Sequence, residues 1–306
     1  MCSSDLDVYV GGVMEHVEEA GIHSGDSACS IPPYSLSDDM VNRIKTACTD
    51  LAMEIGVKGL MNAQIAVKDD EFYIIEVNPR ASRTVPYVSK ATNVPLANVA
   101  TQVAMGKTLK ELGLVGFEPK IEWYAVKEAV FPFNRFAGVD PILGPEMKST
   151  GEVMGWDRSF ARAFLKAQLG AGTHLPTEGT VFISIRDADK TGEMLYTART
   201  LTALGFSIVA TRGTAGWLTE NGVEAEVVNK VYEGGLTVVD RLKDGHIALV
   251  FNTTEGAQAV EDSRDIRAVA LYDKIPYFTT AAASHAAALA MKAREEGELD
   301  VRALQG

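Results

Sequence analysis

Two apolar runs on either side of a short polar turn constrain the fold of this chain more than any other stretch. Residues 60–67 and 72–77 flank the turn at 68–71, a pattern typical of an antiparallel β-hairpin. Gln64 and Glu76 are equally far from Asp70 in sequence, so a hairpin that turns there places them opposite each other. Asn78 follows Glu76 by two positions and therefore points to the same face of its strand.

The predicted hairpin face has a defined chemistry. Gln64, Glu76 and Asn78 offer a carboxylate and carboxamide oxygens, which are hard ligands of the kind that Mg²⁺ prefers. Arg80 and Arg83 follow in the next turn and suit an anion or a phosphoryl group in transfer. A solvated strand end with an ordinary surface ion pair fits the spacing equally well.

Composition limits the classes of protein that the chain can represent. Its 306 residues are 46% hydrophobic, enough for about two domains with full cores. The formal net charge of −12 argues against nucleic acid or an anionic membrane surface as a partner. Three cysteines without metal-ligand spacing (Cys2, Cys29, Cys48) favour reduced thiols in the cytoplasm. We find neither a run of about 18 apolar residues nor a secretory signal.

Helices and loops surround the hairpin in sequence. Ser37 precedes a predicted amphipathic helix at 40–55, with Val41, Ile44, Ala47, Leu51 and Ile55 as its buried stripe. Within 89–105, Pro95 is placed for the first turn of a second helix, with Leu96, Val99, Val103 and Met105 as its core positions. Residues 21–37 form a loop rich in Gly, Ser and Pro, either a connector or a ligand-contacting loop, in which His23 alone is more typical of a structural histidine. Residues 1–6 match no downstream pattern, so we expect the chain to begin inside a longer fold.

The pattern changes after a less regular region, 109–172, that ends in a predicted helix at 159–169. Short apolar strands are then expected at 180–185, 206–211, 224–229, 246–252 and 276–280, with helices such as 193–204 between most of them. Strands that alternate with helices predict a doubly wound parallel sheet of about five strands. The small, polar segment 170–179 is the expected domain boundary.

Polar groups follow three of these predicted strands. Residues 211–214, 229–230 and 252–254 lie at carboxyl ends of strands, where open α/β sheets bind ligands. Hydroxyls, amides and a lysine that meet there would form a phosphate pocket, assisted by the dipole of a following helix. Each segment taken singly is equally compatible with an ordinary helix N-cap.

The segment IEVNPRASRTVPYVSKATNVPLANVA, residues 75–100, closely resembles the large subunit of carbamoyl-phosphate synthetase, an ATP-grasp enzyme. VKEAVFPFNRFAGVDPILGPEMKSTGEVMG, residues 126–155, resembles a later block of the same family. The resemblance implies that Gln64, Glu76 and Asn78 hold Mg²⁺ or Mn²⁺ on the ATP phosphates, and that Arg80 and Arg83 face the reacting anion. It also implies nucleotide contacts from Gly21, Ile22, His23 and Ser24.

The last domain resembles the methylglyoxal-synthase-like regulatory domain of that family through ATRGT, VNKV, FNTT and EDSRDIR. Gly235 is followed by Leu236 where methylglyoxal synthases carry a catalytic aspartate segment, and Ala257-Gln258 replace a basic pair, so regulation is favoured over catalysis. The resemblance implies an effector nucleotide, UMP or IMP, bound by Lys190, Thr211, Thr214, Lys230, Asn252, Thr254 and Ser263. It implies an ornithine site at Glu18, Asp26, Glu128 and Thr279, although a carboxylate cluster is equally expected on an acidic surface.

The predicted fold class is α/β, with a partial ATP-grasp α+β domain (7–108), a connecting region (109–172) and a doubly wound methylglyoxal-synthase-like domain (173–306). The resemblance implies ATP-dependent phosphorylation of carbamate, derived from bicarbonate, in pyrimidine and arginine biosynthesis, with little activity from this chain alone. It further implies K⁺ as a cofactor, a glutaminase small subunit as partner, and oligomers of the full-length protein. The alternatives are another ATP-grasp ligase and a nucleotide-sensing module without activity.

Overall fold

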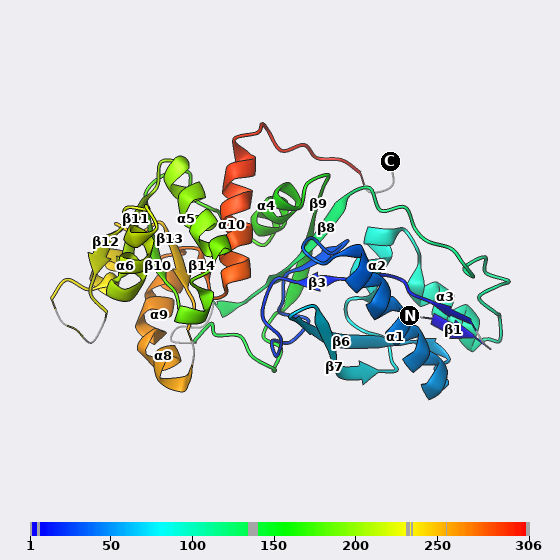
Figure 1. Ribbon diagram of the computed structural model, residues 1–306. Coiled ribbons are helices and arrows are strands. Elements are labelled where there is room, and N and C mark those ends of the chain that lie inside the picture. The colour runs from blue at the N-terminus through cyan, green and yellow to red at the C-terminus, as the bar shows by residue number, and fades with distance from the viewer. Residues whose placement is uncertain are drawn as a thin grey trace.

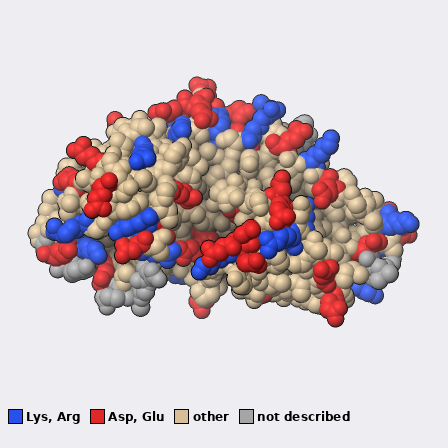
Figure 2. Space-filling view, viewed as in Figure 1, with Lys and Arg blue, Asp and Glu red and all other residues tan. Residues whose placement is uncertain are grey.

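The computed structural model describes residues 2–4, 7–133, 140–230, 233, 235–254 and 256–303, with side chains from residue 7 onward and outside 256–258. Two regions lie side by side, and the long helix α10 stands between them beside α4 and α5 (Figure 1). On the face shown in Figure 2, acidic and basic side chains are interspersed over both regions. Of the described helices, none combines the length and apolar composition that crossing a bilayer requires.

The first region contains three small antiparallel sheets. Their orders are β2-β1-β5, β3-β4-β8-β9 and the two-stranded β6-β7. The strands are β1 (Cys2–Ser4), β2 (Asp7–Tyr9), β3 (Glu15–His16), β4 (Cys29–Ile31), β5 (Gly59–Leu60), β6 (Asn62–Lys68), β7 (Glu71–Asn78), β8 (Tyr124–Val130) and β9 (Gly151–Asp157). The helices are α1 (Asp38–Ile55), α2 (Val85–Thr92), α3 (Leu96–Ala104) and α4 (Phe160–Gly170). Residues 2–4, which matched no pattern in the sequence, therefore belong to a sheet.

Helix α1 begins and ends at the signals that its sequence carries. The Ser37 side chain accepts a hydrogen bond from the backbone amide of Met40, and Gly56 ends the helix in the left-handed conformation. The buried positions are Met40, Ile44, Cys48 and Ala52. Ile44 is buried as predicted, whereas the other buried positions lie one residue away from the predicted Val41, Ala47 and Leu51. This face packs against the β6-β7 hairpin, as expected of a helix that supports it.

The helix predicted to begin at Pro95 is confirmed as α3, with Pro95 as its N-cap. A separate helix, α2, precedes it and ends at Asn93, which adopts a left-handed conformation. A residue before proline is driven away from helical geometry, which explains the break. Leu96, Val99 and Val103 are buried as expected, but Met105 is 82% exposed because it lies beyond the end of α3.

The second region is one parallel sheet, as the alternating strands and helices predicted. Its order is β12-β11-β10-β13-β14, so neighbouring connections change direction between β10 and β13. The strands are β10 (Thr180–Ser184), β11 (Ser207–Thr211), β12 (Glu226–Val228), β13 (Leu249–Asn252) and β14 (Tyr277–Phe278). The helices are α5 (Gly192–Ala203), α6 (Arg212–Glu220), α7 (Val238–Lys243), α8 (Gly256–Asp262), α9 (Arg264–Tyr272) and α10 (Ala281–Arg294), with a 3₁₀ turn at Asp187–Asp189.

Residues 124–170 do more than connect the two regions. Strands β8 and β9 complete the sheet begun by β3 and β4, and α4 packs on both strands. A single apolar cluster continues from Val126 and Phe164 through α10 to Val181 in the parallel sheet. The two regions therefore share a core across α4 and α10.

Candidate functional site

The hairpin forms with the predicted register. Gln64 is paired with Glu76, and Asn62 with Asn78, across β6 and β7. The turn is made by Asp69 and Asp70, both with positive φ, which short polar side chains tolerate better than bulky ones. A bulge between Gln64 and Ile65 shifts the register on the turn side of the pair. The expected opposition of Gln64 and Glu76 is confirmed.

The donor groups on the hairpin suit a hard cation. The Asn78 Nδ2 donates to Glu76 Oε1 over 3.0 Å, which leaves the amide oxygen of Asn78 and the second carboxylate oxygen of Glu76 available. Asn62, which the sequence reasoning did not include, has a buried Oδ1 without a hydrogen-bond partner in the described structure. Among the described residues no three His, Cys, Asp or Glu side chains are grouped as a metal site. The donors therefore fit a metal that takes its remaining oxygens from phosphates and water.

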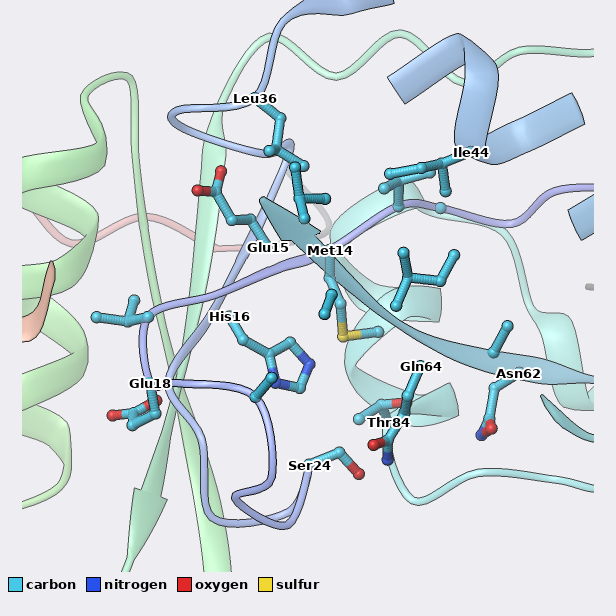
Figure 3. A pocket seen from close by; sticks show the side chains of 18 of the residues that line it. Met14, Glu15, His16, Glu18, Ser24, Leu36, Ile44, Asn62, Gln64 and Thr84 are labelled. Atoms are coloured by element: carbon cyan, nitrogen blue, oxygen red, sulfur yellow. The ribbon is translucent and has the colours of Figure 1, made fainter. Parts of the chain in front are cut away.

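A cavity of about 1020 Å³ adjoins the hairpin. From the predicted set, its lining includes Gly21, Ile22, Ser24, Gln64 and Arg80. In Figure 3, Gln64 and Asn62 lie toward one end of this cavity, Glu18 toward the other, and Met14 between them. The structure thus brings the predicted nucleotide loop and the hairpin to one cavity.

Three predicted residues have local partners instead. The His23 Nδ1 accepts a hydrogen bond from the Gly25 amide over 3.0 Å, which fits a structural histidine. Arg83 is exposed, and its guanidinium lies 2.7 Å from the Met147 sulfur. Arg80 is exposed and donates to the carbonyl of Ala81. Both arginines are near the hairpin end, and within the described parts of the chain neither forms a salt bridge.

The loop at residues 21–26 is fixed by buried polar groups. Lys127, 1% exposed, donates to the carbonyls of Ser24 and Gly25 over 3.1 and 3.2 Å. The Asp26 carboxylate, also 1% exposed, accepts the amides of Lys148 and Ser149. Sequence reasoning missed Lys127, because a lysine inside a strand of mixed residues carries no signal of burial.

Two acidic side chains from the predicted ornithine set lie close enough to affect each other. Burial raises the pKa of Glu18, against the hydrogen bond from the Ala28 amide that lowers it. Burial and the nearby charge of Glu18 raise the pKa of Glu128, which accepts from Gln168 over 2.7 Å. Burial, together with Lys127, lowers the pKa of His16 to about 4. This end of the cavity therefore favours neutral acids or an added cation.

The other two members of that set behave differently. Asp26 uses both carboxylate oxygens on backbone amides, so its role in the structure is to anchor a loop. Thr279 is exposed and follows β14 in the second region. The structure unites Glu18 and Glu128 but gives Asp26 a scaffolding role.

A second cavity, of about 300 Å³, lies at the carboxyl edge of the parallel sheet. It opens where β10 and β13 are neighbours and connections change direction, the usual ligand position in such sheets. All seven residues predicted for the effector nucleotide line it: Lys190, Thr211, Thr214, Lys230, Asn252, Thr254 and Ser263.

This strand-end pocket is preformed by buried hydrogen bonds. The hydroxyl of Thr214, a residue that is 2% exposed, accepts a hydrogen bond from the Ile185 amide. The hydroxyls of Thr211 and Ser184 are hydrogen-bonded to each other over 3.1 Å. Asn252, 3% exposed, donates to the Tyr277 hydroxyl over 2.7 Å. Each of these polar groups is held in place before any ligand arrives.

Charge in the strand-end pocket is mixed. The Lys190 Nζ lies 2.7 Å from an Asp187 carboxylate oxygen, and that hydrogen bond lowers the pKa of Asp187. Arg186, missed from the sequence, also lines the pocket, where its amide donates to the Thr253 hydroxyl. Its position directly after β10 could have identified it. The side chains of Ala257 and Gln258, and residue 234, lie outside the described structure.

Family models match both regions. Residues 7–112 match the carbamoyl-phosphate synthase L chain, ATP binding domain, and residues 193–279 match the MGS-like domain. The protein is therefore of the class that joins an ATP-binding domain of ATP-grasp type to an MGS-like domain, and the predicted fold class is confirmed.

The chain is also similar in sequence to individual proteins of this class. The chain is 53% identical over 298 residues to the carbamoyl phosphate synthase large chain of Myxococcus xanthus (strain DK1622), covering 97% of this chain and 27% of that protein. It is 55% identical over 288 residues to the one of Pseudomonas putida, covering 94% and 26%. A solved long-chain acyl-CoA carboxylase is similar over 53% of this chain and 20% of that one, at 18% identity and a TM-score of 0.42, too low to carry an argument.

The chain belongs to the family of carbamoyl phosphate synthase large chains. It spans about a quarter of the length of the curated relatives it matches.

Proposed function

We propose that this chain carries the carbamate-phosphorylating site of a carbamoyl-phosphate synthase together with a nucleotide-responsive control domain. The observation that supports it most is the pairing of Gln64 with Glu76 across the hairpin, beside Asn78 and next to the large cavity. Such donors suit a metal–nucleotide complex far better than a surface ion pair, because two of the three side chains are uncharged amides.

Within this proposal the residues divide the work by position. Gln64, Glu76 and Asn78 would hold Mg²⁺ or Mn²⁺, and Asn62 adds an amide oxygen from the same face. When bound, the metal supplies charge neutralisation on the ATP phosphates. Gly21 and Ser24 line the cavity with small groups that let a nucleotide approach the backbone, Ile22 adds apolar surface, and His23 stiffens their loop.

The two arginines carry the charge of the reacting groups. Arg80 and Arg83 would orient carbamate and neutralise the phosphoryl group in transfer, a reaction in which catalysis is mostly positioning. Both guanidiniums are exposed, and the contacts found among the described residues are with the Ala81 carbonyl and the Met147 thioether. An incoming anion therefore displaces weak partners, so little interaction energy is given up when the arginines bind the anion.

The remaining assignments follow from the family. We propose domains at 7–108, 109–172 and 173–306, cytoplasmic location, a role in pyrimidine and arginine biosynthesis, bicarbonate-derived carbamate as substrate, a glutaminase small subunit as partner, and oligomers of the full-length protein. Ornithine would act as an activator at Glu18, Asp26, Glu128 and Thr279, and K⁺ would be a further cofactor. UMP or IMP would occupy the strand-end pocket through Lys190, Thr211, Thr214, Lys230, Asn252, Thr254 and Ser263.

The test is metal–nucleotide binding to the purified chain. Calorimetry with ATP and Mn²⁺ should show binding to the wild type and at least about a tenfold loss in Glu76→Gln, because the variant removes the only carboxylate among the donors. Glu71→Gln is the matched control, since Glu71 lies on the same strand but pairs with Arg43 near the turn. Equal affinity in wild type and Glu76→Gln would refute the metal site.

A second function is favoured by the preformed strand-end pocket: a nucleotide sensor without activity of its own. Its polar groups are ordered and its cavity is open without any contribution from the hairpin. Binding of UMP or IMP, with no binding of ATP and Mn²⁺, would support the sensor over the synthase assignment for this chain.

A further inference from the structure

A buried ion pair joins the two regions of the molecule. The Arg267 guanidinium on α9 donates through Nε and Nη2 to the two carboxylate oxygens of Asp140, over 2.7 and 2.6 Å. Arg267 is 3% exposed, and its Nη1 donates to the carbonyl of Val260. These hydrogen bonds hold the pKa of Asp140 below its usual range. Loss of Asp140 would leave the buried Arg267 charge without compensation, whereas the Asp140 side chain is itself 26% exposed.

One side of this pair reaches the strand-end pocket. Ser263, which lines the pocket, accepts the Arg267 amide through its carbonyl over 3.1 Å. Asn252, also in the lining, donates to the Tyr277 hydroxyl, and Tyr277 is hydrogen-bonded to Arg267 in turn. Burial raises the pKa of Tyr277 to about 12, so it stays a neutral hydrogen-bonding group. Arg267 therefore touches two elements that a bound effector would contact.

The other side reaches the large cavity. Asp140 begins the segment 140–149, which runs from α9 to the loop at 21–26. Within this segment the Gly144 carbonyl accepts the His23 amide over 2.9 Å, and the amides of Lys148 and Ser149 bind Asp26. The same segment places Met147 against Arg83. It is thus bonded both to the proposed nucleotide loop and to a proposed catalytic arginine.

A second ion pair between the two regions contributes less stability because it is more exposed to water. Arg186, in the strand-end pocket, pairs with Glu19, in the lining of the large cavity. The Glu19 side chain is 53% exposed, and exposed pairs contribute little because water screens them. The bidentate, buried Arg267–Asp140 pair is the contact whose geometry a small displacement would change most.

We infer that Arg267 and Asp140, with the segment 140–149, transmit occupancy of the strand-end pocket to the loop at 21–26 and to Arg83. This rests on the proposed regulatory function of that pocket. A ligand that displaces Ser263 or Asn252 shifts α9. The bidentate pair transmits this shift to the segment 140–149, whose far end is fixed by hydrogen bonds to Asp26. Because such coupling is reciprocal, occupancy of the large cavity changes affinity at the strand-end pocket by the same factor.

The experiment measures amide hydrogen exchange of the full chain with and without UMP, and in a second series IMP. In the wild type, saturating nucleotide should change the exchange rate of amides in residues 21–26 by about fivefold, the lower end of typical coupling. Asp140→Asn should bind the nucleotide with unchanged affinity by calorimetry, since it lies outside the pocket, and lose most of that change. Glu146→Gln, an exposed acid on the same segment, is the matched control and should behave as wild type.

The outcomes separate this inference from the function on which it rests. Nucleotide binding that leaves residues 21–26 unchanged in the wild type, or an undiminished response in Asp140→Asn, overturns the coupling alone. Absence of binding by either nucleotide overturns the regulatory function and the coupling together. If Asp140→Asn does not fold, Arg267→Lys tests the same contact, because an ammonium cannot make the bidentate pair; Arg264→Lys on the exposed side of α9 is its control.

Discussion

The hairpin and the strand-end pocket collect similar polar side chains but hold them differently. At the hairpin, Glu76 and Arg80 are exposed, and the one bond between the predicted metal donors joins Glu76 to Asn78. In the pocket, Thr214 and Asn252 are almost fully buried and bonded to the protein. At the hairpin, the side chains of the proposed site become fully held only when a ligand binds. In the strand-end pocket, the protein itself holds the side chains before a ligand binds.

The difference follows from the sheets that carry the two sites. The hairpin is a two-stranded sheet with α1 on one face, and isolated hairpins are marginal without such support. The pocket lies at the edge of a five-stranded parallel sheet buried on both faces. Substitutions at the hairpin should therefore lower ligand affinity, whereas substitutions in the strand-end pocket should lower the free energy of unfolding.

The largest effect is expected in the scaffold that supports both sites. A Cβ at Gly155 of β9 would lie 2.0 Å from the Ala163 carbonyl oxygen of α4, so Gly155→Ala forces the helix off its sheet. We expect a loss of about 3 kcal/mol in the free energy of unfolding, measured in urea. Gly151→Ala on the same strand, where a Cβ meets open space, is the control. A Gly155→Ala protein as stable as the control would contradict the packing described for α4.

At the strand-end pocket, Asn252→Ala should destabilise the chain by about 2 kcal/mol, because it removes a buried hydrogen bond and leaves the Tyr277 hydroxyl with one partner fewer. Urea unfolding measures the loss. Thr254→Ala, in the same pocket but less buried, should cost much less. If both variants lose the same stability, the pocket is not preformed in the sense described.

The acid pair near the large cavity makes stability depend on pH. Because the folded state raises the pKa of Glu128, its stabilising protonated form is present below the unfolded value of about 4.5 and is lost as pH rises. Glu128→Gln should therefore become progressively more stable than wild type as the pH rises from about 5 to about 9, measured by thermal unfolding. Glu152→Gln, an exposed acid on the neighbouring β9, should show no such trend. A difference that stays constant with pH would exclude burial as its cause.

The smallest expected effect, on the stability of a hairpin variant, tests most directly whether the hairpin and the strand-end pocket differ. Glu76→Gln, which should weaken metal–nucleotide binding at least about tenfold, should change the free energy of unfolding by no more than about 0.5 kcal/mol, because its side chain is exposed. Thermal unfolding without ligand measures it. A large loss would mean that Glu76 belongs to the folded scaffold and that the hairpin is as preformed as the pocket.

Local patterns in the sequence were sufficient for most elements. The opposition of Gln64 and Glu76 was predicted from their positions around a polar turn. Counting from the observed turn alone would pair Gln64 with Ile75, and the bulge between Gln64 and Ile65 brings Glu76 opposite Gln64. The five parallel strands followed from their apolar runs. The helix start at Pro95 was also predicted correctly, whereas Met105, predicted as a core position, is exposed because α3 ends at Ala104.

By itself the sequence determined which residues carry polar chemistry and on which strand ends they stand, because alternation and strand direction are local properties of the chain. Only the tertiary structure decided that Lys127 and Asp26 anchor the loop at 21–26, and that Arg267 reaches Asp140 across the two regions. Those contacts join residues more than a hundred positions apart in sequence. They depend on how α4, α10 and the sheets pack, which no local pattern encodes.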